Sequence, residues 1–127
     1  NASCVAQLQR GAMIDGVALD GVMVGRAAYH NPWLMADWDE LLFGLPPREQ
    51  ALTREAVEAE MVAYTEREMA RTAGWAHGEV RWPQVIRHIL GLYHGLPGAR
   101  RWRQVWSDHK LKDLPPSAVM AMAHQRP

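Results

Sequence analysis

The sequence predicts a mainly α-helical chain in which one strand-to-helix unit is followed by a set of about four helices. Apolar residues recur at helical spacing along most of the chain, and short Gly/Pro-rich breaks separate the periodic segments. A single β-rich run, residues 17–24 (VALDGVMV), interrupts this pattern near the N-terminus. Short breaks favour antiparallel packing of successive helices, so we expect the second part of the chain to be a helical bundle.

The composition is that of an ordinary folded domain with an uneven charge distribution. Hydrophobic residues make up 48% of the 127 residues, which is enough to form a core. Residues 1–74 carry six basic and eleven acidic residues (net −5), whereas residues 75–127 carry eight basic and three acidic residues (net +5). The basic second half suggests an anionic partner, with chance clustering on a solvated helix face as the competing interpretation.

Several classes of site are not expected from the residue types present. Cys4 is the single cysteine and is interpreted as a small buried residue, and the six histidines lack metal-ligand spacing, so we expect no metal. No apolar run is long enough to span a membrane. We find no combination that could supply a nucleophile or a general acid pair, and therefore expect no catalytic residue in this chain. The single cysteine suggests an intracellular protein, and the missing initial Met and signal-peptide layout suggest a fragment or a processed piece.

The strand of the first unit is predicted over residues 17–24. Its apolar centre is continuous, as in a strand that is buried on both faces of a parallel sheet. A lone strand is not stable in water, so its sheet must lie outside this chain or form with another copy. Before it, residues 3–14 are predicted to contain a short helix that ends near Gly11, and Asp15-Gly16 is a turn signal.

A helix over residues 27–43 is predicted to follow this strand. Pro32 suits the first turn of a helix, with Asn31 as its N-cap. The sequence Gly-Leu-Pro-Pro at residues 44–47 ends the helix and begins a linker. We therefore expect two domains, residues 1–45 and residues 46–127.

Four further helices are predicted over residues 48–73, 84–94, 99–109 and 117–124. The apolar stripe of the first is expected to comprise Val57, Met61, Val62, Tyr64 and Met69. Its glutamates, among them Glu58, are interpreted as a solvated face rather than a catalytic pair. In the later helices Tyr93 and Trp102 fall on the apolar side and are expected in the core, and His88 is interpreted as a packed histidine with a hydrogen-bond partner.

Gly25-Arg26, where the predicted strand meets the helix, is a candidate anion site. Parallel α/β proteins bind ligands at the carboxyl ends of their strands, and barrel folds commonly hold a phosphate after the last two. Glycine allows close approach of the backbone, and arginine adds a fork of donors. From this pattern alone, a tight turn with a surface arginine is the stronger interpretation.

The segment 87–103 (RHILGLYHGLPGARRWR) is the second candidate. Two predicted helices joined by a tight Gly/Pro turn present several arginines, with aromatic residues interleaved. Arg100 and Arg103 lie three residues apart, on one face and away from the apolar side, so they are free for a ligand. Arginines on a rigid helix pair suit contacts to nucleic-acid phosphates.

Two long motifs stand out in the sequence, DGVMVGRAAYHNPWLM at residues 20–35 and IRHILGLYHGLPGARRWR at residues 86–103. Together they resemble the tRNA-dihydrouridine synthase family, in particular its DusA subfamily. The resemblance implies that the chain holds the last β/α unit of an FMN-binding (β/α)8 TIM barrel, followed by a helical domain that binds tRNA. It further implies that Gly25 and Arg26 hold the FMN phosphate and that Arg100 and Arg103 contact tRNA.

The reaction implied by the resemblance is the reduction of a D-loop uridine of tRNA (U20/U20a) to 5,6-dihydrouridine, with NADPH as the reductant of FMN. The family's proton-donating cysteine and most of its barrel are absent from this sequence, and Cys4 is not that cysteine. We therefore expect the parent protein to be the enzyme and this chain alone to be inactive. The parent is expected to be monomeric and cytoplasmic, or organellar in a eukaryote.

Two other interpretations remain open. A stand-alone helical RNA-binding module without flavin chemistry would share the helical second part. A different FMN barrel oxidoreductase would share only the phosphate turn, and the Arg100/Arg103 pair argues against it.

Overall fold

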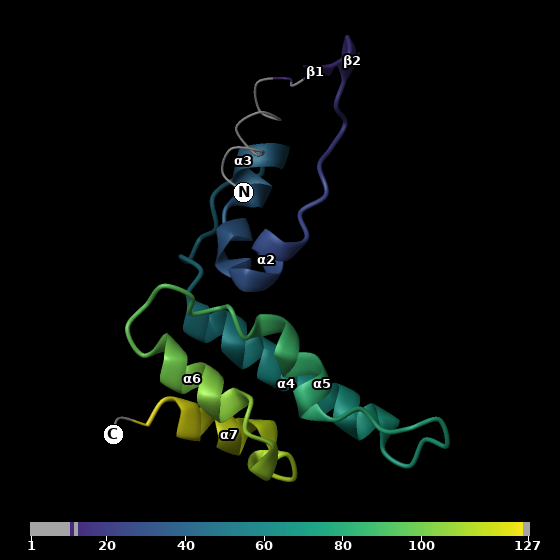
Figure 1. The fold of residues 1–127 in the computed structure, drawn as a ribbon, viewed down its shortest axis with the longest axis vertical. Coiled ribbons are helices and arrows are strands. Elements are labelled where there is room, and N and C mark those ends of the chain that lie inside the picture. The colour runs from purple at the N-terminus through teal and green to yellow at the C-terminus, as the bar shows by residue number, and fades with distance from the viewer. Residues whose placement is uncertain (1–10, 12, 126–127) are drawn as a thin grey trace. The chain divides into compact units, whose positions relative to one another are not determined.

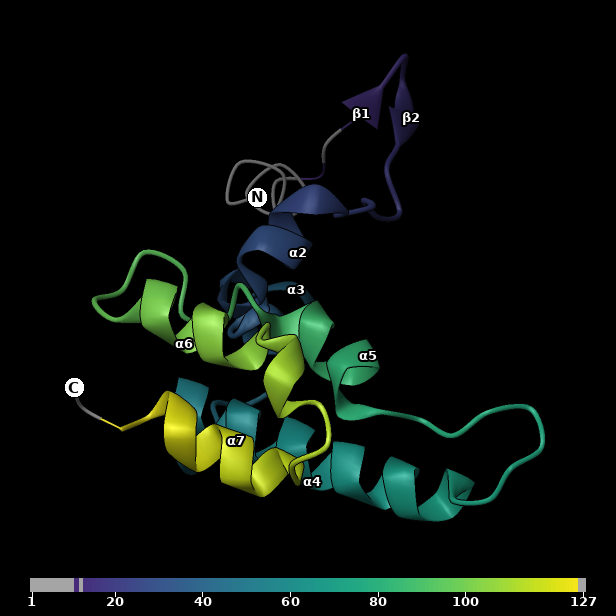
Figure 2. The same ribbon diagram turned by 60° about the horizontal axis from the view of Figure 1, so that its bottom comes forward.

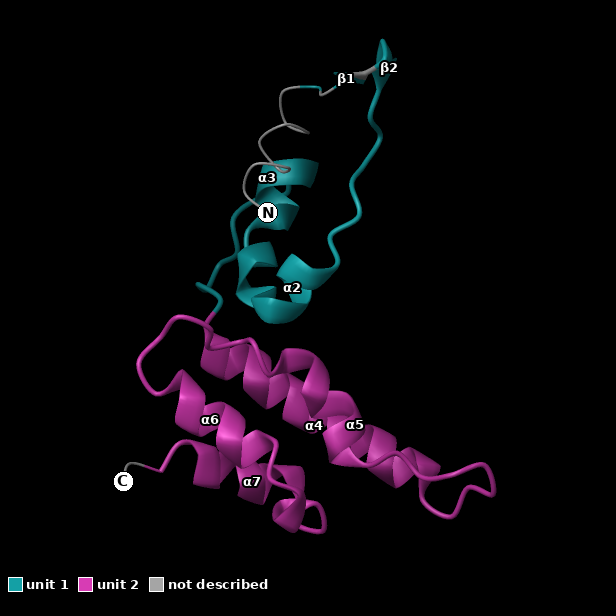
Figure 3. Ribbon diagram, viewed as in Figure 1, with its two compact units in different colours: residues 1–52 teal, residues 53–127 magenta. Residues whose placement is uncertain are grey.

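The computed structural model describes residue 11 and residues 13–125. The chain divides into two compact units, Asn1–Leu52 and Thr53–Pro127, which Figure 3 shows in different colours. Its described part is mainly helical, which confirms the predicted class. The assignment of residues 1–45 to a barrel and of residues 46–127 to a tRNA-binding domain stays a prediction.

The first unit contains a short β-hairpin (Figure 1). Strands β1 (Met13–Ile14) and β2 (Val17–Ala18) pair antiparallel, with Ile14 opposite Val17. The two linking residues have positive φ, 51° at Asp15 and 78° at Gly16. Asp-Gly is the favoured pair for such a two-residue turn, so the predicted turn is confirmed.

The strand predicted over residues 17–24 is wrong beyond Ala18. Residues 19–25 form no regular secondary structure, and Val22 and Met23 are 42% and 89% exposed. A doubly buried strand needs a neighbour on each side, and the described residues supply only the hairpin. The short helix expected to end near Gly11 lies almost wholly outside the described residues, and Cys4 lies outside them as well.

The helix predicted over residues 27–43 is broken into pieces. They are helix α2 (Arg26–His30), the 3-10 helix η1 (Pro32–Met35) and helix α3 (Trp38–Phe43). Asn31 stands at the first break with φ −147°, because Pro32 disfavours a helical residue before it. The Asn31 side chain makes no capping hydrogen bond, contrary to expectation, whereas Gly44 ends α3 in the left-handed conformation, as expected.

Helix α4 (Arg54–Thr72) begins six residues later than the predicted start at residue 48. Its N-cap is Thr53, whose Oγ1 accepts a hydrogen bond from the Ala56 backbone N–H at 3.1 Å. The buried residues of α4 are Glu58, Val62, Thr65 and Thr72. Of the predicted stripe, Val62 is buried as expected and Val57, Met61 and Met69 are half-buried, whereas Tyr64 is 45% exposed. The other buried residues of α4 are polar, so apolar periodicity located the inner face only in part.

The remaining helices of the second unit are α5 (Trp82–Ile86), η2 (Arg87–Ile89), α6 (Ala99–Trp106), η3 (His109–Leu111) and α7 (Pro116–Ala123). The predicted helix 84–94 is thus only partly helical. Trp102 is 3% exposed and Tyr93 is half-buried, which confirms their expected place in the core. His88 is exposed, so its interpretation as a packed residue is wrong, but it does have the expected hydrogen-bond partner, since Arg87 Nε donates to its Nε2 at 3.4 Å.

The helices of the second unit pack around one core. Helix α4 packs against α5 and α7, and α7 packs against α6, as Figure 2 shows. The core contains the apolar residues Val62, Trp82, Ile86, Ile89, Leu92, Trp102, Trp106, Val119 and Ala123. Over the described ranges, no helix has the length and apolar character that a membrane crossing requires. The same ranges hold no cluster of three potential metal ligands.

Candidate nucleic-acid interface and phosphate turn

The first candidate site lies at the start of α2. Gly25 is the N-cap of this helix and accepts a hydrogen bond from the Tyr29 backbone N–H at 3.2 Å. No side chain caps the helix, so no capping residue bonds the N–H groups of its first turn. Arg26 is exposed and forms no ion pair within the described ranges. Backbone N–H groups and a guanidinium are the types of donor that bind phosphate, so the residues present fit a phosphate group. The strand expected before them is not formed.

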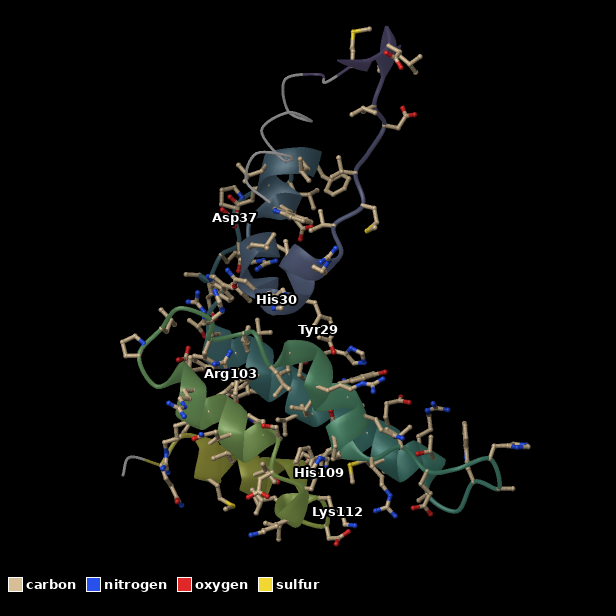
Figure 4. The ribbon with its side chains drawn as sticks, viewed as in Figure 1. Tyr29, His30, Asp37, Arg103, His109 and Lys112 are labelled. Carbon is tan, nitrogen blue, oxygen red and sulfur yellow. The ribbon has the colours of Figure 1, made fainter. Side chains whose placement is uncertain are left out.

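The second candidate site is the outer face of α6. Gly98, with φ 83°, lets the chain turn from the Gly-Leu-Pro-Gly segment into this helix. Arg100, Arg101 and Arg103 are all exposed, and Figure 4 labels Arg103 on α6. Among the described residues, none of these three guanidinium groups pairs with a carboxylate. They form a basic surface that is available to a polyanion.

The four predicted site residues are divided between the two units. Gly25 and Arg26 belong to the first unit, and Arg100 and Arg103 belong to the second. Arg26, Arg100 and Arg103 are all exposed, as expected.

Sequence reasoning missed a buried carboxylate on α4. Glu58 is 0% exposed, so its interpretation as part of a solvated face is wrong. Its Oε1 accepts hydrogen bonds from the indole N–H groups of Trp102 and Trp106, both at 2.9 Å. Its Oε2 accepts from the Tyr93 hydroxyl at 3.2 Å and lies 2.6 Å from His124 Nε2. A carboxylate has about four acceptor positions, and these four groups occupy them.

A signal for this carboxylate was present in the sequence. Buried Trp and Tyr side chains usually find a hydrogen-bond partner for their N–H or O–H groups. Because Tyr93 and Trp102 were already expected in the core, an acceptor had to lie among the helices that cover them. Glu58 also stands four and seven residues before Val62 and Thr65, which share its buried face.

The same carboxylate shifts the titration of Tyr93. Burial of the phenol is the largest cause, and the nearby charges of Glu58 and Glu55 add to it, so the pKa of Tyr93 lies well above its ordinary value. The neutral phenol is thus the form that suits the folded state, in which it donates to Glu58 Oε2.

Alkaline conditions are therefore expected to destabilise the fold partly through Tyr93. The unfolded chain releases the Tyr93 proton from about pH 10, whereas the folded chain retains it. This contribution to stability is complete below about pH 10 and is lost as the pH rises through the folded pKa. Urea unfolding between pH 8 and pH 11 should show a smaller fall in the free energy of unfolding for Tyr93→Phe than for wild type. Tyr64→Phe, at an exposed phenol, is the matched control, and an identical fall in all three proteins would contradict the assignment.

Each unit thus carries exposed arginines of the kind that can bind phosphate groups: Arg26 at the uncapped start of α2, and the three arginines of α6. Comparison with known proteins identifies the family. The family model described as "Dihydrouridine synthase (Dus)" matches residues 2–124, so the chain belongs to the dihydrouridine synthase family.

Three similar curated proteins share the name tRNA-dihydrouridine(20/20a) synthase. The chain is 40% identical over 109 residues to the tRNA-dihydrouridine(20/20a) synthase of Shewanella oneidensis, covering 84% of this chain and 29% of that protein. It is 39% identical over 107 residues to the Vibrio cholerae synthase of the same name, covering 84% of this chain and 29% of that protein. It is 44% identical over 108 residues to the Pseudomonas aeruginosa synthase, covering 82% of this chain and 29% of that protein. The chain therefore spans less than a third of the length of these relatives.

Proposed function

We propose that this chain is the C-terminal part of a tRNA-dihydrouridine synthase and that it provides the tRNA-binding helical domain of the enzyme. The observation that carries the proposal is the exposed Arg100/Arg103 pair on α6, in a chain that belongs to the dihydrouridine synthase family. The basic second half supports it, because phosphate contacts made by Arg and Lys dominate affinity for nucleic acids.

The proposed role of the first unit is to complete the FMN-binding barrel. There residues 17–24 would pair with barrel strands, and the backbone at Gly25 and the guanidinium of Arg26 would hold the FMN phosphate. When bound, FMN supplies the hydride for reduction of a D-loop uridine, U20 or U20a, and NADPH serves as the reductant. The part that this chain plays is to bind and orient the flavin phosphate and the tRNA. We place the enzyme in the cytoplasm as a monomer.

A chimaera tests this proposal. The barrel part of the Shewanella oneidensis relative, joined to this chain, is expected to form dihydrouridine in tRNA from a strain that lacks its own synthases. The barrel part alone is the control. Dihydrouridine measured by mass spectrometry of tRNA digests should appear with the chimaera only. A chimaera that is folded and binds tRNA but forms no dihydrouridine would contradict the proposal and favour the stand-alone RNA-binding module.

Arg26→Ala in this chimaera is expected to reduce flavin retention. Loss of a charge-assisted hydrogen bond to a phosphate should weaken FMN binding roughly tenfold to a hundredfold. The measurement is the flavin absorbance that remains per protein after gel filtration. Arg48→Ala is the matched control, since Arg48 is an arginine of the same unit whose guanidinium faces Asp39 at 3.5 Å. Equal FMN retention in Arg26→Ala and Arg48→Ala would sink the role of Arg26.

A further inference from the structure

We propose that Glu58 is a positioning residue for tRNA binding, because it sets the rotation of α6 about its axis and so the direction in which Arg100 and Arg103 point. This inference rests on the proposed function and extends it to a residue that does not touch tRNA. Glu58 is fully buried on α4, whereas the two arginines are exposed on α6. Any effect of Glu58 on tRNA is therefore indirect, and the helix that carries the arginines is one of the elements that Glu58 contacts.

The rotation of α6 is defined by two hydrogen bonds to one atom. Trp102 and Trp106 are separated by about one helical turn, and both donate their indole N–H to Glu58 Oε1 at 2.9 Å. One residue of an α-helix corresponds to a rotation of about 100°, so a rotation of this size would remove both donors from the oxygen. A single acceptor shared by two side chains of one face thus permits one rotational setting of the helix.

The arginines occupy the rest of the same short helix. At about 100° per residue, Arg100 lies roughly 160° from Trp102, on the side away from Glu58. Arg103 follows Trp102 directly and lies at the flank of the buried face. The setting that brings both indoles to Glu58 therefore also sends Arg100 and Arg103 to solvent. Apolar packing alone is less directional, because hydrophobic burial has no preferred angle.

The carboxylate is itself held in place from two other segments. The Tyr93 hydroxyl donates to Oε2 at 3.2 Å from the chain before α6, and His124 Nε2 lies 2.6 Å from the same atom at the end of α7. Rings of this group also contact one another, with the Tyr93 and Trp102 centroids 4.8 Å apart and those of Trp102 and Trp106 6.4 Å apart. Glu58 is therefore a fixed reference point rather than a mobile partner.

Three tryptophan-to-phenylalanine variants test the inference in the full chain. Trp102→Phe and Trp106→Phe keep a ring in the core but remove a donor to Glu58. Trp82→Phe is the matched control, because Trp82 is 1% exposed and packs edge-to-face on Trp106, yet its indole N–H has no hydrogen-bond partner among the described residues. We expect the double variant Trp102→Phe/Trp106→Phe to raise the Kd for tRNA about fivefold or more, once the Kd is corrected for the fraction of folded protein. Trp82→Phe should leave the Kd unchanged.

Glu58→Gln separates positioning from stability. The glutamine oxygen still accepts from the indoles, so the tRNA Kd should stay within about twofold of wild type even if the melting temperature falls. In the Arg100→Ala/Arg103→Ala background, the Trp102→Phe/Trp106→Phe change should add no further loss of affinity. Two outcomes overturn the inference: wild-type affinity in the folded Trp102→Phe/Trp106→Phe variant, or an equal loss in Trp82→Phe. A folded wild-type chain that does not bind tRNA would overturn the proposed function, and this inference with it.

Discussion

Replacing Arg100 and Arg103 together by alanine is expected to raise the Kd for unmodified tRNA by roughly tenfold to a hundredfold at physiological salt. Both guanidinium groups are exposed and unpaired within the described ranges, so each can make charge-assisted hydrogen bonds to phosphate without first breaking an ion pair. The fold should be unaffected, because neither side chain is part of the core. Filter binding or fluorescence anisotropy with a tRNA transcript measures the effect.

The matched control is Arg67→Ala/Arg71→Ala on α4. These are also two exposed arginines about one helical turn apart, so this variant changes the net charge by the same amount, although Arg71 differs in being paired with Glu68 at 2.6 Å. It should alter the Kd by less than about threefold, since it changes only the long-range attraction. Arg100→Lys/Arg103→Lys should lie between wild type and the alanine variant, because lysine keeps the charge but loses the planar fork. An equal loss of affinity in the α4 and α6 variants would show that overall charge, and not this surface, controls binding.

Replacing Glu58 by leucine is expected to lower the free energy of unfolding of the second unit by about 3–5 kcal/mol. Leucine accepts no hydrogen bond, so the indole N–H groups of Trp102 and Trp106 would remain buried without partners. Each such group carries a desolvation penalty of about 1–3 kcal/mol. Urea unfolding followed by circular dichroism measures the change.

Glu58→Gln provides the comparison for stability, as it does for binding. It keeps an acceptor for the indoles but loses the negative charge beside His124, so we expect a smaller loss, about 1–2 kcal/mol. A Glu58→Leu variant as stable as wild type would contradict the account. It would mean that the indoles find other acceptors, and that the Glu58 contacts are not the main support of α6.

Much of the fold follows from local sequence signals. Gly44 ends α3 and Pro83 stands in the first turn of α5, because each residue has a backbone preference that its neighbours do not override. The Thr53 cap of α4 is an equally local signal, but the start predicted at residue 48 overlooked it. The strand over residues 17–24 was not predictable in this way. Its conformation depends on partner strands, and the motif at residues 20–35 indicates a strand only in the context of a whole barrel.

Some residues of the candidate site could likewise be predicted from the sequence, and others could not. Arg100 and Arg103 could be placed on an exposed face from their spacing relative to Trp102, since helical periodicity fixes which residues point together. Glu58 could not be placed from hydropathy, because a buried carboxylate has the same residue type as a solvated one. Its burial depends on donors that lie 35 to 66 residues away in the chain. Local reasoning does not reach such contacts, although the need of buried indoles for an acceptor indicates that one exists.

The most direct test of the central claim is a titration of unmodified tRNA with the folded 127-residue chain over about 50–200 mM salt, repeated with Arg100→Ala/Arg103→Ala. The account predicts that wild-type affinity falls steadily with increasing salt and that the double variant binds more weakly. A plot of the logarithm of the binding constant against the logarithm of the salt concentration has a negative slope. For the variant this slope should be less steep by roughly two, one for each lost phosphate contact. A folded chain that does not bind tRNA, or a double variant with the affinity and slope of wild type, would contradict the assignment of this surface to tRNA.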